Sequence, residues 1–247
     1  MAKGKRGGRR AEREGSMTQS HTGATVTQQA SGTGDVTSSN RDYTQMSDTD
    51  ATRLRTKYDE SYKPDVVDAI KLYISNSNPN KDGFSHSQNL NYKLDHGAKL
   101  NPTEKFIDDN IQKGMHDLGR DTKLTRYCHD DILQQCGISN YQNMSESQLK
   151  SALIGTEFQT TSYTSYSYDT NKNPFRPSAI GGNGREVTMV TNAGADTKMV
   201  YGKKTQAEIV VNKGTKQKIT DVYYDGTTAY PRNKNSMPRV VIVTETI

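Results

Sequence analysis

Apolar residues recur at helical spacing in the first part of the chain and in short alternating runs after residue 155. The segment 101–118 shows the helical pattern clearly, because its apolar residues lie three or four positions apart on one face. Asn101 and Pro102 stand where an N-cap and a first-turn proline favour the start of a helix. The apolar residues of this face are Ile107, Ile111, Met115 and Leu118.

Two further segments carry the same periodicity. Pro64 opens the segment 64–77, whose apolar residues also fit one face of a helix. The segment 144–155 begins with the capping-box pair Ser145 and Gln148 and closes on a glycine. We therefore expect helices ahead of the strands.

After residue 155 the chain is rich in β-branched and aromatic residues. Gly, Asn, Asp and Lys separate the runs, as is typical of antiparallel strands joined by turns. Helices followed by mostly antiparallel strands predict an α+β domain over residues 49–247. The runs are FQTTSYTSYSY, REVTMVT, TKMVYG, AEIVV, KQKITDVYY and PRVVIVTETI.

The first 48 residues have a different composition. Residues 1–14 contain six Lys or Arg and two Glu, a net charge of +4 out of the formal +5 of the whole chain. Residues 15–48 are rich in Ser, Thr, Gln and Gly, and bury too little apolar surface to offset the entropy of ordering. We expect 1–48 to be a disordered tail. Its basic arm suits contact with nucleic acid or an anionic surface, or serves as a solubilising or packaging tail.

The cellular location of the protein can be judged only from targeting signals that the sequence lacks. Hydrophobic residues make up 31% of the chain, the mean hydropathy is −0.92, and no long apolar run predicts a transmembrane helix. The basic N-terminus is not followed by the apolar stretch of a secretory signal. Two locations are therefore expected: association with a virion and injection into a host, or the cytoplasm.

The chain has two cysteines, Cys128 and Cys136, eight residues apart. Only His129 accompanies them, so the paired ligand spacing of a zinc site is missing. We expect reduced thiols, no disulfide framework and no metal site.

The run LTRYC at 124–128 has the alternation of a strand. Leu124, Arg126 and Cys128 share one face, so Arg126 points inward if that face is the core. A buried guanidinium needs a partner, and its planar fork suits a carboxylate or a phosphate. A structural ion pair at a strand edge is the alternative interpretation.

A run of hydroxyl side chains follows in FQTTSYTSY (158–166). In a strand, Thr160, Thr161 and Ser162 offer hydrogen bonds to a ligand or to a neighbouring carboxylate. Phe158 and Tyr163 flank them and are suited to pack against a flat ring or within the core. A solvated Thr- and Ser-rich strand is the alternative.

The third signal is QAE at 206–208. In a strand, Gln206 and Glu208 face the same way. The apolar run Ile-Val-Val after Glu208 places this carboxylate where the chain enters a core, in a rigid and partly desolvated position. An exposed glutamate at a strand end is the alternative.

In their order and spacing, these signals resemble the Arg–Ser–Glu branch of the mono-ADP-ribosyltransferase family. The branch includes clostridial Rho-modifying exoenzymes, the enzymatic components of binary toxins and related phage-encoded proteins. AEIVVNKGTKQKITDV looks like the last catalytic strand and turn of the family, and TEFQTTSY looks like its Ser-Thr-Ser strand. The likeness covers roughly residues 60–247 and leaves the tail unexplained.

The chain departs from the family pattern at three places. Arg126 precedes Tyr127, whereas the family motif has the tyrosine first. Thr160 takes the place of the first serine and keeps its hydroxyl. Gln206 replaces the first glutamate of Glu-x-Glu, a replacement that goes with acceptors other than arginine, such as asparagine.

The resemblance implies both a fold and a reaction. The fold has N-terminal helices packed on a mostly antiparallel core of two β-sheets. The reaction breaks the nicotinamide–ribose bond of NAD, which is a substrate, and passes ADP-ribose to a side chain of a protein acceptor. No metal takes part.

The resemblance also implies roles for individual residues. Glu208 stabilises the oxocarbenium-like ribose that forms as nicotinamide leaves, with support from Ser162. Gln206 hydrogen-bonds the incoming acceptor side chain. Arg126 pairs with the diphosphate of NAD. The other residues expected at the NAD site are Thr160, Thr161, Tyr163 and Phe158, the last two as stacking partners of nicotinamide.

Two other functions fit the same residues. A non-catalytic, virion-associated structural or binding protein would keep the fold, but Arg126, Ser162 and Glu208 would not converge on one cleft. An NAD glycohydrolase would use the same site with water as acceptor and release free ADP-ribose. The sequence does not identify the acceptor protein. By analogy with the family, Gln206 narrows only the type of side chain that accepts ADP-ribose.

Overall fold

The computed structural model describes residues 24–28, 42–75, 84–128, 132–133, 136–169, 187–227 and 238–247. The basic arm 1–14 lies outside this part of the chain, so its predicted contact with nucleic acid or an anionic surface stays a prediction.

The described helices form where their capping signals stand in the sequence. Capping boxes open three of them, through Ser85 and Gln88, Asn101 and Glu104, and Ser145 and Gln148. Helices are thus confirmed within 64–77, 101–118 and 144–155, although each ends earlier than predicted. None of the helices in the described ranges is long and apolar enough to cross a membrane. The helices are α1 (Asp48–Asp59), α2 (Pro64–Tyr73), α3 (His86–Asp95), α4 (Pro102–Gly114) and α6 (Glu146–Leu153).

Gly114, the last residue of α4, lies against α2. A Cβ atom at Gly114 would lie 2.5 Å from Cγ1 of Val66, so only glycine allows α2 and α4 to approach this closely. The chain then turns into the short strand β2 (His116–Asp117) at the edge of the sheet.

The described strands form a sheet in the order β1-β4-β9-β10-β6-β3-β5-β8-β7-β2. Neighbouring strands are antiparallel except β10 and β6, which are parallel, so the predicted α+β class with a mostly antiparallel core is confirmed. The remaining strands are β1 (Ala24–Gln28), β3 (Thr122–Cys128), β4 (Glu157–Thr160), β5 (Thr164–Ser167), β6 (Val187–Ala193), β7 (Lys198–Tyr201), β8 (Glu208–Val211), β9 (Lys216–Thr227) and β10 (Pro238–Thr246).

The sheet consists of two halves with a narrow join. β3 and β5 pair at one position, Thr125 with Ser167, whereas β3 pairs with β6 along its whole length. We call β1-β4-β9-β10-β6-β3 the first half-sheet and β5-β8-β7-β2 the second half-sheet. The core was predicted as two sheets; in the described residues the strands are connected as one sheet that narrows to this single pair.

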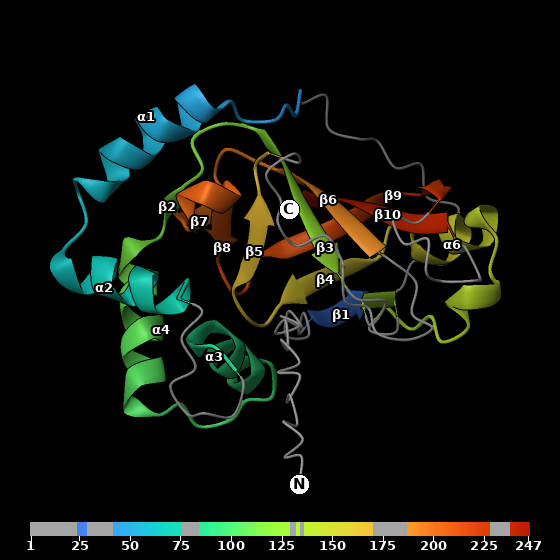
Figure 1. Ribbon diagram of the computed structural model, residues 1–247. Coiled ribbons are helices and arrows are strands. Elements are labelled where there is room, and N and C mark those ends of the chain that lie inside the picture. The colour runs from blue at the N-terminus through green and yellow to red at the C-terminus, as the bar shows by residue number, and fades with distance from the viewer. Residues whose placement is uncertain are drawn as a thin grey trace, which may run out of the picture.

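Helices cover the two half-sheets separately (Figure 1). Helices α2, α3 and α4 pack on one face of the second half-sheet, where Ile70, Leu90 and Ile107 meet Val200 and Val210. Helix α6 packs on the first half-sheet near β9 and β10. A third cluster, on the other face of the second half-sheet, includes Leu124 of β3 and Ile209 of β8. The helices thus cover the half-sheets separately, while this third cluster packs across the join.

The structure differs from the predicted tail in two places. β1 pairs antiparallel with β4, so five residues of the Ser- and Thr-rich segment add an edge strand through backbone hydrogen bonds. Nearer the body, Met46 is buried and its sulfur accepts a hydrogen bond from the hydroxyl of Tyr201. Composition alone missed both, because neither contact needs a run of apolar residues.

Candidate functional site

Glu208 is the first residue of β8 and lies beside the join of the two half-sheets. It pairs with Ser167 of β5, which in turn pairs with Thr125 of β3, the neighbour of Arg126. Glu208 is 8% exposed and Arg126 is 7% exposed. Two opposite charges that lie far apart in the sequence are thus buried in the same region.

The turn between β7 and β8 holds the Glu208 carboxylate. The backbone N–H of Lys203 donates to Oε2 of Glu208 over 2.8 Å. A Cβ atom at Gly202 would lie 2.4 Å from the same oxygen, so the carboxylate packs directly on the glycine backbone. Arg55 of α1 donates to the Gly202 carbonyl and lies over the ring of Tyr201. This turn is therefore fixed from both sides.

Arg126 points inward, as expected from its face of the strand. Its Nη1 donates to the backbone carbonyl of Ser165 in β5, over 3.3 Å. This contact crosses the join, because Arg126 belongs to the first half-sheet and Ser165 to the second.

The hydroxyl of Tyr73, at the end of α2, is buried and is affected by both charges. Asn91 of α3 donates to it over 3.1 Å. Burial raises the pKa of Tyr73, and the nearby charge of Glu208 raises it further, while Asn91, Arg126 and Ser165 act in the opposite direction. The hydroxyl therefore stays protonated at neutral pH.

Tyr73 and Asn91 were not singled out from the sequence. Asn91 is a buried amide next to Leu90, which is fully buried in the core under the helices. A polar residue on an apolar helix face is a signal that would have found it. Tyr73 gave no comparable signal, because a tyrosine at the end of a helix stripe is usual in a core.

The hydroxyl triplet Thr160, Thr161 and Ser162 does not lie beside Glu208. β4 ends at Thr160, and the next two residues form the bend that leads into β5. Thr164 pairs with Val211, the last residue of β8, so Ser162 lies beyond the end of β8 opposite to Glu208. The prediction of one continuous strand was wrong here.

The side chains of this triplet have other partners. Thr160 donates to the carbonyl of Asn212 over 3.4 Å, and Thr161 donates to Asp95 of α3 over 2.6 Å. On β5, which pairs with β8, the serine hydroxyls of the same polar run belong to Ser165 and Ser167, and Ser167 is paired with Glu208. The sequence showed the run but not its register.

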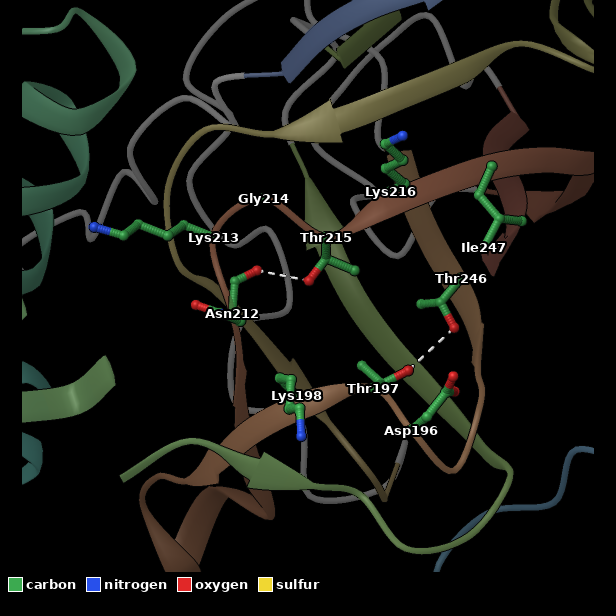
Figure 2. A pocket seen from close by; sticks show the side chains of 10 residues that line it. All are labelled: Asp196, Thr197, Lys198, Asn212, Lys213, Gly214, Thr215, Lys216, Thr246 and Ile247. Carbon is green, nitrogen blue, oxygen red and sulfur yellow. Dashed lines mark hydrogen bonds between the residues drawn. The ribbon is translucent and has the colours of Figure 1, made fainter. Parts of the chain in front are cut away.

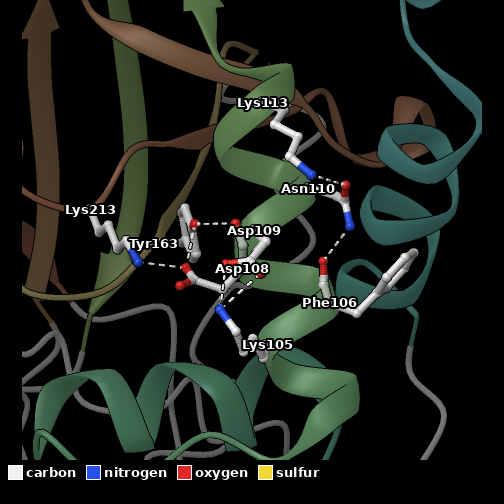
Figure 3. A network of polar contacts seen from close by, with 8 residues as sticks. All are labelled: Lys105, Phe106, Asp108, Asp109, Asn110, Lys113, Tyr163 and Lys213. Carbon is white, nitrogen blue, oxygen red and sulfur yellow. Dashed lines mark hydrogen bonds and ion pairs between the residues drawn. The ribbon is translucent and has the colours of Figure 1, made fainter.

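Phe158 and Tyr163 are both core residues. Phe158 is 1% exposed and packs in the cluster under α6. The hydroxyl of Tyr163 donates to Asp108 of α4, and Lys213 makes an ion pair with the same carboxylate (Figure 3). Of the two interpretations made from the sequence, packing in the core describes where both rings lie.

Gln206 lies in a short 3-10 helix, Lys204–Gln206, and not in the strand. Ala207, between it and Glu208, has left-handed backbone angles with φ of 49°. The alternation rule that placed both side chains on one face therefore does not apply. Gln206 is half-buried, and its carbonyl accepts a hydrogen bond from Ser167.

A hollow of about 410 Å³ opens at the other end of β8 (Figure 2). None of the predicted site residues lines it. Its hydroxyls are already bonded within the protein: Thr215 donates to the carbonyl of Asn212, and Thr197 and Thr246 bond each other. The hollow is thus separate from the charged groups at the join. Its lining residues are Asp196, Thr197, Lys198, Asn212, Lys213, Gly214, Thr215, Lys216, Thr246 and Ile247.

Comparison with known proteins agrees with this arrangement. Residues 52–244 match the family model described as ADP-ribosyltransferase exoenzyme. The chain has the fold of Plx2a, an ADP-ribosyltransferase toxin from Paenibacillus larvae, with a TM-score of 0.57 and 15% identity over 81% of this chain and 96% of that one. No match was found among curated proteins.

Two further solved structures share the fold. An ADP-ribosyltransferase from Clostridium botulinum superimposes with a TM-score of 0.57 and 15% identity, over 83% of this chain and 98% of that one. An ADP-ribosyltransferase-fold protein from S. aureus, solved with NAD, gives a TM-score of 0.52 and 17% identity, over 81% of this chain and 95% of that one.

The fold and the family model together define the class of protein: an NAD-dependent enzyme that transfers single ADP-ribose units to proteins. The chain belongs to the ADP-ribosyltransferase exoenzyme family, and NAD is its substrate. The resemblance noted from the sequence is therefore confirmed at the level of family, fold and reaction.

Replacing Gly202 by alanine tests how closely the turn holds the carboxylate. We expect Gly202→Ala to lower the free energy of unfolding by about 1–3 kcal/mol, since the new methyl group overlaps the Glu208 side chain. In a Glu208→Ala background the same change should cost much less. Urea unfolding of the four proteins measures this coupling. An equal cost in both backgrounds would contradict the contact.

Proposed function

We propose that Glu208, Arg126, Tyr73 and Ser165 form the site at which the chain cleaves NAD. The observation that carries the proposal is that a buried carboxylate and a buried guanidinium lie on strands linked through Ser167, and that both charges act on the buried hydroxyl of Tyr73. Because buried charges are costly, two of them so placed favour a site made for a ligand that carries both signs. NAD meets this condition, with a diphosphate and a nicotinamide ribose that becomes cationic during cleavage.

In the proposed reaction, the bond between ribose C1′ and the nicotinamide nitrogen breaks, and nicotinamide leaves with the bonding electrons. The ribose is left with oxocarbenium-like positive charge, as in glycoside cleavage. Glu208 stabilises this charge, because its carboxylate is already held in place by the Lys203 N–H and does not have to reorganise. The acceptor side chain then bonds to C1′ and gives up a proton.

Arg126 binds the diphosphate of NAD. Its guanidinium is oriented by the carbonyl of Ser165, and its planar fork matches the oxygens of a phosphate. Tyr73 and Ser165 take the supporting role that the sequence gave to Ser162. The Ser165 carbonyl holds Arg126, and the charges of Glu208 and Arg126 both act on Tyr73, so these two residues would position the ribose and the carboxylate relative to Arg126.

Gln206 faces the acceptor. It lies in the turn that leads into Glu208, and Lys204 and Thr205 beside it are exposed. An acceptor that approaches this turn meets a hydrogen-bonding amide next to the reactive ribose. Gln206 would then govern which side chain is modified more than it governs cleavage of NAD.

We also propose that the chain is an effector of the toxin type. The structural neighbours named toxins support this, since they share the fold over most of the chain. Delivery by a phage particle remains a prediction from the basic arm.

Labelled NAD tests the proposed reaction. We expect the wild-type chain to label a protein in a bacterial or eukaryotic lysate, and Glu208→Gln to lower labelling by about 100- to 1000-fold, because the amide cannot stabilise the cationic ribose. The measurement is label on the protein together with free nicotinamide. Glu146→Gln, at the start of α6 on the first half-sheet, is the matched control.

The possible outcomes separate the candidate functions. Release of nicotinamide with free ADP-ribose and no labelled protein would indicate a glycohydrolase. No release from a folded wild-type chain would contradict the proposed site and favour a non-catalytic protein.

Two serine variants test the register of the polar run. We expect Ser165→Ala to slow nicotinamide release about tenfold, the equivalent of one lost hydrogen bond, because Ser165 lies beside Tyr73. Ser162→Ala should have a much smaller effect, since Ser162 lies beyond the far end of β8. Steady-state rates of nicotinamide release decide the point. A larger loss for Ser162→Ala would restore the role that the sequence suggested.

A further inference from the structure

We propose that Tyr166 and Gln217 are positioning residues that hold the two sides of the NAD site in register across the join. This inference rests on the proposed function, because it assumes that Arg126 and Glu208 act on one NAD molecule. It adds residues that do not touch the substrate.

The join needs such a device because its backbone pairing is minimal. Arg126 belongs to the first half-sheet, while Ser165 and Glu208 belong to the second. One residue pair, Thr125 with Ser167, links the half-sheets in the described strands. Beyond this pair, the apolar cluster of Leu124 and Ile209 also spans the join. Apolar contacts fix the angle between the halves less precisely than hydrogen bonds do, and any shift would change the distance between guanidinium and carboxylate.

Tyr166 crosses the join on the face opposite to Ser165. Strand alternation sends its side chain away from the helices, into the cluster with Leu124 and Ile209. There its hydroxyl accepts a hydrogen bond from Nε2 of Gln217, over 3.1 Å. Gln217 belongs to β9 of the first half-sheet and is fully buried.

The first half-sheet holds Gln217 in turn. Oε1 of Gln217 accepts a hydrogen bond from Thr244 of β10 over 2.8 Å, and the hydroxyls of Thr244 and Thr191 of β6 lie 2.9 Å apart. Thr191 and Thr244 are buried, and Tyr166 is 3% exposed. Strands β6, β9 and β10 of the first half-sheet therefore hold the hydroxyl of Tyr166, which belongs to the second half-sheet.

This network fixes the peptide next to the site. Arg126 donates to the carbonyl of Ser165, the residue before Tyr166, and the Ser165 side chain lies beside Tyr73. Holding Tyr166 therefore holds the group that orients Arg126. Burial raises the pKa of Tyr166, so its hydroxyl stays neutral at the pH of assay.

Packing alone does not need these polar groups. Apolar side chains of similar size would fill the same space without the cost of burying an amide and three hydroxyls. Hydrogen bonds differ from apolar contacts in fixing direction and distance, and the network has its partners satisfied. The hydrogen-bond network therefore fixes the distance and the angle between the two half-sheets.

The test compares Tyr166→Phe with the double variant Tyr166→Phe/Gln217→Met. Tyr166→Phe removes the link and leaves the buried amide of Gln217 with one partner fewer, so it should lower both activity and Tm. In the double variant the amide is gone and Thr191 and Thr244 keep each other, so Tm should recover. The readouts are KM for NAD and kcat in nicotinamide release, Tm, and the Kd of NAD by calorimetry.

We expect KM and Kd for NAD to rise about tenfold in both variants, with a smaller change in kcat, because a displaced Arg126 loses binding that it provides throughout the reaction. Ile219→Val, in the core on β9, is the matched control and should leave KM unchanged. Recovery of KM together with Tm in the double variant would overturn the positioning role, as would an unchanged KM in Tyr166→Phe.

Failure of the proposed function looks different. A wild-type chain whose nicotinamide release is absent or independent of Glu208, and which binds no NAD, would overturn the NAD site itself and this inference with it. A wild-type chain that is active and a Tyr166→Phe variant that matches it would overturn the inference alone.

Discussion

The pairing of Thr125 with Ser167 is the contact on which the site depends. It joins two half-sheets that different helices cover, α6 on one and α2, α3 and α4 on the other, and that share one apolar cluster. Because Arg126 follows Thr125 and Glu208 pairs with Ser167, the same contact brings a guanidinium and a carboxylate into one region. A junction between layers is a common place for a ligand site, since it allows groups from distant segments to converge.

Local hydrogen bonds on each side of this join offset the cost of burying the two charges. Glu208 is bonded by the Lys203 N–H and packed against Gly202, and Arg126 donates to the Ser165 carbonyl. Such groups have little freedom left, which suits a reaction whose transition state carries charge at a fixed position. The helices contribute Tyr73 and Asn91, so the layer that covers the second half-sheet also completes the site.

The sequence predicted the fold class and the family better than it predicted the positions of the site residues. Capping boxes and apolar spacing are local signals, and they located three helices correctly. The inward direction of Arg126 and the partly desolvated position of Glu208 were predicted from strand alternation and from the apolar run after Glu208, and both side chains are buried; their role in catalysis stays a prediction. The placement of Ser162 was wrong because register depends on where β4 ends and β5 begins, and two adjacent hydroxyl runs look alike. Gln206 was put in the strand because nothing in the sequence shows the left-handed angles of Ala207. Tyr73 and Tyr166 depend on tertiary contacts alone.

The most direct measurement of the central claim is a crystal structure of the Glu208→Ala chain with NAD, in which turnover is blocked. The account predicts that the diphosphate lies against Arg126 and that the nicotinamide ribose faces residue 208 beside Tyr73. NAD bound in the hollow between Asn212 and Thr246, or with its diphosphate away from Arg126, would contradict it.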